Sequence, residues 1–415
     1  MLCGIQSDYL GRKTTIMVTQ VISFSGILCI LLSTNMTLLY VGNLLAGYSN
    51  AIFIGLVPVY TGEISQARIR KATGSFMSMM FFVGFAVTYS IGSLASWKTT
   101  ASIIMVWPLY AFVLLFFCPE SPTWLINKGR NDLAVKTLIS LRGDEGVAMK
   151  EIGRIEHNLK RQNLEMFHHS VHLKDQLKII TKGTFVRPSV VVTVLLAIGW
   201  QWGGYSMELY TVEIVEGLDI PISPYWVSSG IGYYQLIGSL LGVGLSSVLP
   251  RRKYYIGSGI CIFIGAAILG TKIHLQKYSL FVEVSNTYPV IKWIPVIGLL
   301  IFFSGYSTGY IAVSFMLMGE LLPSNARGTG IFIVMQLTNI SGFLMIKYEP
   351  FMQKQLGLDG LFWLMSCVSL FSIVFAYFCV PETYGKTLEE IEEHYRNICY
   401  PKGELEKRAL KSPGS

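Results

Sequence analysis

Residues 62–70 read Gly-Glu-Ile-Ser-Gln-Ala-Arg-Ile-Arg, and residues 319–327 read Gly-Glu-Leu-Leu-Pro-Ser-Asn-Ala-Arg. Each stretch directly follows a long apolar run, begins with the same Gly-Glu pair and ends on an arginine. Glu320 follows Glu63 by 257 positions. The return of one charged motif at the end of two apolar runs predicts an internally duplicated protein that spans a membrane.

Two further motifs repeat in the same order. Gly-Arg-Lys at residues 11–13 returns as Pro-Arg-Arg at 250–252, so that Arg251 follows Arg12 by 239 positions. Pro-Glu-Ser-Pro at residues 119–122 returns as Pro-Glu-Thr-Tyr at 381–384, 262 positions later. A single duplication with loops of variable length accounts for all three pairs.

The composition agrees with a membrane protein. Apolar residues make up 52% of the 415 positions, charged residues only 14%, and the mean hydropathy is +0.50. A soluble fold carries about 25% charged residues, so these values exclude an aqueous globule, a disordered chain and a disulfide scaffold. The cysteines form no C-x-x-C pair, and five lie in apolar runs, where we expect small buried hydrophobic residues: Cys29, Cys118, Cys261, Cys367 and Cys379.

Stretches without Asp, Glu, Lys or Arg locate the membrane spans. A helix needs about 20 apolar residues to cross the hydrocarbon core. Nine such stretches occur, and the first is long enough for two crossings, so the sequence predicts ten helical spans. The stretches are 14–62, 72–97, 99–119, 188–207, 220–250, 254–271, 293–319, 328–346 and 360–381.

The distribution of positive charge predicts the orientation. With a cytosolic N-terminus, only six of the 33 Lys and Arg residues fall in outer loops and the other 27 in inner ones. The positive-inside rule therefore places both termini in the cytosol. The net charge of +8 is then a feature of topology, and we expect a lipid bilayer as partner and no nucleic acid.

The same pattern predicts four regions. They are an N-terminal bundle (1–117), a cytosolic helical linker (118–187), a six-span C-terminal bundle (188–380) and a cytosolic tail (381–415). Ser121-Pro122 has the pattern of a helix N-terminus, and residues 387–390 form a capping box that opens a helix through Arg396. Two spans precede Arg251 in the second half but none precedes Arg12, so the N-terminal bundle is expected to lack its first two spans. A chain that starts at Met1 is then expected to be inactive by itself.

Taken together, five motifs resemble those of the sugar porters of the major facilitator superfamily, in particular the facilitated trehalose transporters. They lie at residues 8–13, 63–70, 119–125, 320–327 and 381–390. The resemblance implies an all-α membrane protein with the major facilitator fold, in which two pseudo-symmetric helical bundles hold ten of the usual twelve spans. It also implies transport of a sugar, trehalose or a hexose, at the plasma membrane by alternating access, with facilitated diffusion as the expected mode. No enzyme motif, metal site or cofactor site is recognisable, and the His168-His169-x-x-His172 cluster is expected to be solvated.

The resemblance further implies a cytosolic gating network, because acids and bases recur at matched positions at the cytosolic ends of spans. Its expected members are Asp8, Arg12, Glu63, Arg70, Glu120, Arg251, Arg252, Glu320, Arg327 and Glu382. Pro250 stands where the family has glycine, which predicts a weaker latch. The simpler interpretation is that these charges only anchor helix ends.

Polar residues within spans are the candidates for solute contact. Gln201 and Gln235 fall where the family carries sugar-contacting amides, whereas neighbouring family positions are altered here. The full set of expected substrate-binding residues is Gln201, Gln235, Trp200, Ser206, Ser78, Phe315, Thr338 and Asn339. For each of them the alternative is helix–helix packing.

Glu208 follows 20 charge-free residues, so we expect a solvated carboxylate at the membrane surface. The alternative is a cation- or proton-sensitive group at the outer gate. The absence of an unpaired acid deep in any span then predicts transport that is insensitive to a proton gradient. Two other functions stay open: transport of a different small solute, suggested by the altered cavity residues, and a non-transporting truncated form.

Overall fold

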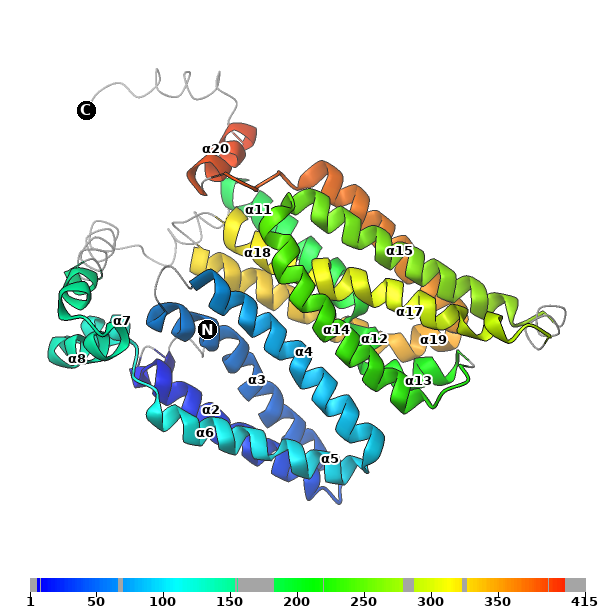
Figure 1. Cartoon of the computed structure of the whole chain (residues 1–415), viewed down its shortest axis with the longest axis horizontal. Helices are drawn as coiled ribbons and strands as arrows, with labels where there is room; N and C mark the ends of the chain where they lie inside the picture. The colour runs from blue at the N-terminus through cyan, green and yellow to red at the C-terminus, as the bar shows by residue number, and fades with distance from the viewer. Residues whose placement is uncertain are drawn as a thin grey trace. The chain divides into compact units, whose positions relative to one another are not determined.

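The chain is built from helices, and no strand occurs in the part that the computed structural model describes (Figure 1). The described residues are 6–7, 9–65, 70–153, 155, 183–218, 220–278, 287–322, 327–386 and 388–399. They fall into two compact units, Met1–Met80 with Leu94–His172 (unit 1) and Phe81–Ser93 with Leu173–Ser415 (unit 2). The bundle boundaries at residues 117 and 187 stay a prediction.

Each of the ten predicted spans coincides with a described helix, and seven helical segments of the described part are long and apolar enough to cross a membrane. The first four spans are α2 (Arg12–Leu31), α3 (Met36–Ile64), α4 (Arg70–Leu94) and the pair α5 (Trp97–Ile104) and α6 (Val106–Phe117). The later spans begin with α11 (Gly183–Leu195), η1 (Leu196–Tyr205) and α12 (Ser206–Leu209), followed by α13 (Thr211–Glu216), α14 (Pro224–Val248) and α15 (Arg251–Leu275). They end with η2 (Pro289–Trp293), α17 (Ile294–Gly305), η3 (Tyr306–Tyr310), α18 (Ile311–Leu321) and α19 (Arg327–Cys379).

Helix α19 holds two predicted spans, because its residues stay helical up to a bend at Gly357, where φ is 75°. Glycine adopts this left-handed conformation at little cost. The outer loop expected between 346 and 360 is therefore mostly helix.

Matching glycines let the helices of each unit approach closely. A Cβ atom on Gly26 of α2 would lie 2.9 Å from the Gly42 carbonyl oxygen of α3, and one on Gly265 of α15 would lie 2.8 Å from the Gly298 oxygen of α17. Close backbone contact at small residues is typical of packing in membranes. Gly265 follows Gly26 by 239 positions, the same interval that separates Arg251 from Arg12. The duplication thus extends from the charged motifs to the helix crossings.

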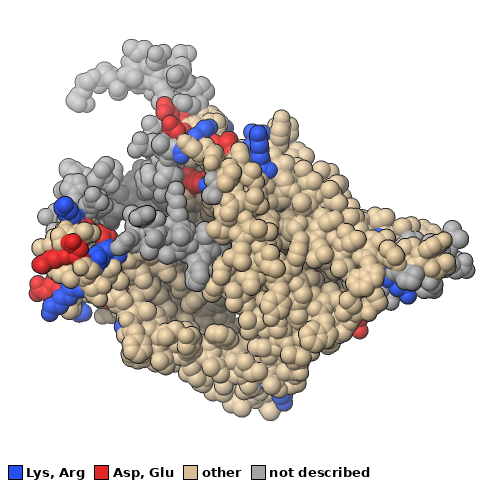
Figure 2. Space-filling view, in the orientation of Figure 1, with Lys and Arg blue, Asp and Glu red and all other residues tan. Residues whose placement is uncertain are grey.

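Large apolar side chains cover the outside of the spans. Phe117 is 83% exposed and Phe378 is 78% exposed, and Figure 2 shows broad surfaces free of charged side chains over the helices. Such surfaces are suited to lipid rather than water. The expectation of buried cysteines is wrong for Cys367 and Cys379, which are exposed on α19, while Cys29, Cys118 and Cys261 are half-buried.

Short helices follow α6. The predicted helix start at Ser121-Pro122 is confirmed: the Ser121 hydroxyl accepts a hydrogen bond from the Trp124 backbone N–H at the start of α7 (Pro122–Asn127). In α8 (Asn131–Arg142), Arg142 donates two hydrogen bonds to Glu151 and one to the Ile64 carbonyl at the end of α3. The bond with Glu151 raises the pKa of Arg142, so this pair stays charged and ties the linker to α3. Near the chain end, α20 runs Leu388–Cys399.

Candidate functional site

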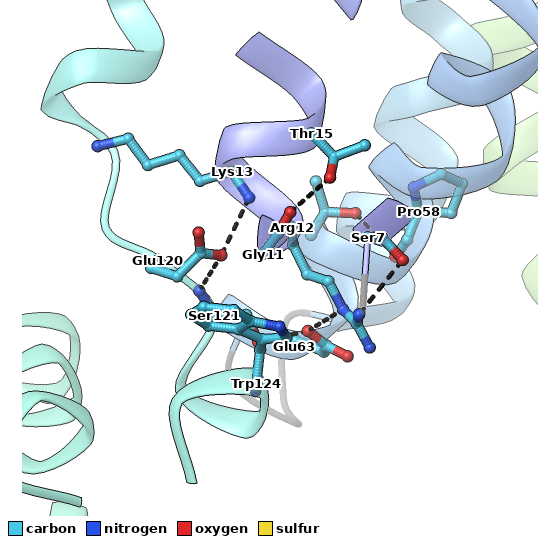
Figure 3. A network of polar contacts seen from close by, with 11 residues as sticks. Ser7, Gly11, Arg12, Lys13, Thr15, Pro58, Glu63, Glu120, Ser121 and Trp124 are labelled. Carbon is cyan, nitrogen blue, oxygen red and sulfur yellow. Dashed lines mark hydrogen bonds and ion pairs between the residues drawn. The ribbon is translucent and has the colours of Figure 1, made fainter. Parts of the chain in front are cut away.

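In unit 1, three helix ends meet at Glu63, the acid of the stretch quoted first (Figure 3). Arg12 opens α2 and places its Nε atom 3.7 Å from Glu63 Oε2 near the end of α3. The Ser121 hydroxyl at the start of α7 donates a hydrogen bond to the same carboxylate. The acid, the base and the hydroxyl therefore come from three segments that are far apart in sequence.

Glu120 completes this network at the N-terminus of α2. Its Oε1 atom accepts hydrogen bonds from the backbone N–H groups of Lys13, at 3.0 Å, and of Ser121, at 2.9 Å. A carboxylate at this end also complements the positive end of the helix dipole. Gly11 makes the approach possible, since its φ is 100° and an added Cβ would lie 2.6 Å from Glu120 Oε2.

Unit 2 contains the same arrangement. Arg251 opens α15 and places Nε 3.5 Å from Glu320 Oε1 at the end of α18. Thr383 donates a hydrogen bond of 2.6 Å to Glu320 Oε2. Glu382 accepts the backbone N–H groups of Arg251, at 2.8 Å, and of Arg252, at 3.3 Å.

The two networks share one design: a carboxylate on a helix N-terminus, and a second carboxylate between an arginine and a hydroxyl. Of the predicted gating residues, the structure brings Arg12, Glu63 and Glu120 together in unit 1. In unit 2 it brings together Arg251, Arg252, Glu320 and Glu382, and the Arg252 guanidinium also stacks 4.7 Å from the Tyr377 ring. Asp8 and the side chains of Arg70 and Arg327 lie outside the described residues. The hydroxyls of Ser121 and Thr383 were missed, although both follow a repeated Pro-Glu pair.

The predicted substrate residues begin on η1, where the helix widens to π-helical geometry. Gln201 is 3% exposed, and Trp200 and Ser206 are also buried. Next to them, Gly204 leaves room for the ring of Tyr306, because an added Cβ would lie 2.6 Å from that ring. π-Helical turns are frequent at functional sites.

Helices α18 and α19 each contact η1. The Gln201 amide lies against Gly342 of α19, where an added Cβ would be 2.5 Å from it. Phe315 of α18 contacts Trp200, with 5.4 Å between ring centroids. Thr338, one helical turn before Gly342, is buried and bonds to its own helix at the Val334 carbonyl.

One predicted residue does not join this group. Asn339 is exposed, since it follows Thr338 and points to another side of α19. The side chain of Ser78 lies outside the described residues, as does the His168, His169 and His172 cluster. Within the described ranges, no group of His, Cys, Asp and Glu side chains is arranged to hold a metal ion.

Gln235 of α14 is fully buried, and its amide nitrogen donates a hydrogen bond of 2.9 Å to Glu208 Oε1. The hydroxyl of Tyr306 lies 3.4 Å from the other oxygen, Glu208 Oε2. Glu208 is only 2% exposed. The expectation of a solvated carboxylate is therefore wrong, because three segments distant in sequence enclose this acid.

Several buried polar atoms of unit 2 have no hydrogen-bond partner among the described residues. We call six of these atoms the buried polar group: Trp200 Nε1, Gln201 Oε1, Ser206 Oγ, Gln235 Oε1, Ser314 Oγ and Glu349 Oε2. Within the group, the Ser206 and Glu349 side chains lie close to each other. Ser314 and Glu349 were not predicted. Glu349 shares the buried face of α19 with Thr338, Gly342 and Met345, and this helical spacing is the signal that could have found it.

An all-helical membrane protein with a duplicated charge network and a buried polar group has the features of a solute transporter. A profile of the family "Sugar (and other) transporter" matches residues 1–395. The chain belongs to this family.

Named relatives agree with this assignment. A facilitated trehalose transporter homologue of Drosophila simulans is 28% identical over 93% of this chain and 76% of its own length. A facilitated trehalose transporter of Culex quinquefasciatus is 28% identical over 96% and 74%.

Solved structures show the fold. The inward-open xylose transporter XylE from E. coli superposes with a TM-score of 0.73 at 20% identity, covering 95% of this chain and 85% of that one. XylE bound to 6-bromo-6-deoxy-D-glucose gives a TM-score of 0.69 over the same shares. The predicted major facilitator fold is confirmed.

Proposed function

We propose that this protein carries trehalose or a hexose across the plasma membrane by alternating access, down the sugar gradient, with both termini in the cytosol. The observation that carries the proposal is the set of buried polar atoms without partners on η1, α14 and α18. Buried polar groups are hydrogen-bonded in the great majority of proteins, and each one left unsatisfied costs about 1–3 kcal/mol. A molecule rich in hydroxyl groups supplies the missing donors and acceptors.

The chemistry of the group suits a sugar. Gln201 and Gln235 each present an unpartnered amide oxygen, an acceptor for a hydroxyl, and Trp200 Nε1 presents a donor. The Trp200 ring also contacts the rings of Tyr205 and Phe315, so that apolar faces lie beside the polar atoms. Sugars have hydroxyl groups at their edges and C–H groups on their faces. The hydroxyl groups suit the polar atoms, and the C–H faces suit the aromatic rings.

The duplicated networks support the transport mechanism. The side chains of the two ion pairs are only 13–27% exposed, so each pair should hold more tightly than the about 0–1 kcal/mol of a fully exposed pair. Each pair still reaches water at the ends of the spans, where it can separate as helices tilt. Each unit has an equivalent network, so the ion pairs of both units can form and separate in the same way. This suits alternating access, in which two related bundles rock against each other. The positions of the networks at the Arg- and Lys-rich ends of the spans are consistent with a cytosolic location.

Counterflow in proteoliposomes tests the function. Vesicles that contain the protein are loaded with unlabelled sugar, and entry of radiolabelled trehalose or D-glucose is measured. The proposed function requires transient accumulation above that of empty vesicles, whereas the inactivity expected from the missing pair of spans requires none. Entry of another solute class without sugar counterflow would favour the alternative substrate, and saturable sugar binding without counterflow would favour the non-transporting form.

A substitution at Gln235 tests the site. Because the amide oxygen is expected to accept a substrate hydroxyl, Gln235→Ala should raise the apparent KM about tenfold. Ser239→Ala is the matched control, since Ser239 lies one turn further along α14, is also buried, and bonds only within its own helix. Equal KM values for both variants at normal surface levels would assign Gln235 to helix packing instead.

A further inference from the structure

Glu208 is a buried acid that the transport proposal leaves without a role. It lies on α12 directly after the π-helical stretch η1, and all its described polar contacts are neutral. No Lys, Arg or His among the described residues forms an ion pair with it. An ionised carboxylate buried without a counter-charge is costly, so the site must accommodate either that charge or a proton.

The groups around Glu208 come from four elements. Gln235 of α14 and Tyr306 of η3 face its carboxyl oxygens. Tyr89 of α4 donates its hydroxyl hydrogen bond to the Glu208 backbone carbonyl, and Tyr205 lies one turn before it on η1. The other buried acid of this region, Glu349 of α19, lies near Ser206 and Glu213. Glu208 is thus the one acid in direct contact with Gln235 within the described residues.

The Gln235 amide can satisfy Glu208 in two ways. When Glu208 is ionised, the amide N–H donates to it and the amide oxygen stays unpartnered, which is the observed arrangement. When Glu208 carries a proton, its O–H donates to the amide oxygen, and a half-turn of the amide presents the N–H₂ group instead. An amide supplies two donors and one acceptor oxygen, so one bond to Glu208 forms in either state.

We propose that Glu208 is a positioning residue whose proton occupancy decides which atom of Gln235 meets the substrate, so that sugar affinity depends on pH. This inference rests on the proposed function. A hydronium ion transfers one proton to the carboxylate and leaves as water, and apart from this O–H exchange only the hydrogen bond between Glu208 and the Gln235 amide changes.

The expected direction follows from the observed arrangement. Donation from the amide to an ionised carboxylate polarises the amide and makes its free oxygen a stronger acceptor. The ionised state should therefore hold a sugar hydroxyl more tightly, and affinity should rise from acidic to alkaline buffer. By linkage, sugar binding should release a proton.

Equilibrium binding of radiolabelled trehalose and D-glucose to the purified full chain, across a pH series, tests the inference. We expect the wild-type Kd to fall about tenfold from acidic to alkaline buffer, whereas the Kd of Glu208→Gln, which cannot ionise, should stay constant. Glu216→Gln is the control, because Glu216 is exposed on α13, and it should keep the wild-type profile. A Glu208→Gln profile that follows the wild type, or a flat wild-type profile, would overturn the inference.

A second measurement needs no variant at Glu208. In weakly buffered solution, a pH-sensitive dye should report proton release when sugar is added to the wild-type protein. Release should persist in Glu216→Gln, because Glu216 is an exposed acid on α13. Sugar binding without proton release would overturn the role of Glu208 and leave the transport proposal intact, whereas absence of binding at every pH would contradict the transport proposal itself.

Discussion

At the scale of single residues, Gly342 gives the sharpest test of the buried polar group. An added Cβ would lie 2.5 Å from the Gln201 amide, which is the flexible end of that side chain. Gly342→Ala should therefore displace the amide rather than the helix backbone. We expect sugar affinity to fall about tenfold, the effect of about one hydrogen bond, while thermal stability changes little.

The control for this variant is Gly230→Ala in α14, because a Cβ at Gly230 meets no atom within 4 Å. Both substitutions raise helix propensity by a similar amount, so only Gly342→Ala should affect binding. Unchanged affinity in Gly342→Ala would show that the position of Gln201 does not matter to the substrate.

The sequence predicted which residues lie inside spans where a family motif marked the position, but it did not predict contacts between distant segments. The burial of Gln201 and Gln235 agrees with their predicted place inside spans. Glu208 was misplaced, because the end of a charge-free run says nothing about residues 89, 235 and 306, which enclose it. Asn339 was grouped with Thr338, although adjacent helical residues point in different directions.

At the scale of elements, the carboxylates on helix N-termini allow a local prediction. Glu382 accepts the backbone N–H groups of Arg251 and Arg252 through its two oxygens. A glutamine has only one acceptor oxygen, so Glu382→Gln leaves one N–H without a partner and removes the charge at the helix end. The first turn of α15 should therefore lose about 1 kcal/mol of stability.

The exchange rate of backbone amide hydrogens measures this loss of stability directly. The amides of the first turn of α15 should exchange roughly fivefold faster in Glu382→Gln, as a loss of about 1 kcal/mol requires. Glu393→Gln on α20, where the side chain is exposed, should leave that turn unchanged. Equal protection in both variants would mean that Glu382 does not stabilise the helix end.

Hydropathy predicted where the spans lie but not their inner geometry. The ten spans follow from runs of apolar residues, which burial in lipid requires. The π-helical turns η1 and η3 and the continuation of α19 to Gly357 were not predicted. A change in hydrogen-bond register leaves the apolar composition unaltered, so it gives no hydropathy signal.

At the scale of the whole molecule, the repeated motifs predicted a duplication that the geometry confirms. Arg12, Glu63 and Ser121 in unit 1 match Arg251, Glu320 and Thr383 in unit 2, down to the hydroxyl that bonds the acid. The sequence could show this duplication because charged residues make up only 14% of the chain and the same charged motifs recur in the same order. The buried polar group has no such repeat, so its members had to come from the resemblance or the structure.

The central claim is that the buried polar group of unit 2 is a sugar-binding site. It is tested most directly by equilibrium binding of radiolabelled trehalose and D-glucose to the purified 415-residue chain and to Gln201→Ala. Thr193→Ala is the control, since its hydroxyl bonds only within α11. We predict saturable binding by the wild type and the control, and at least about tenfold weaker binding by Gln201→Ala. Absence of saturable binding, or equal affinity in all three proteins, would contradict the claim.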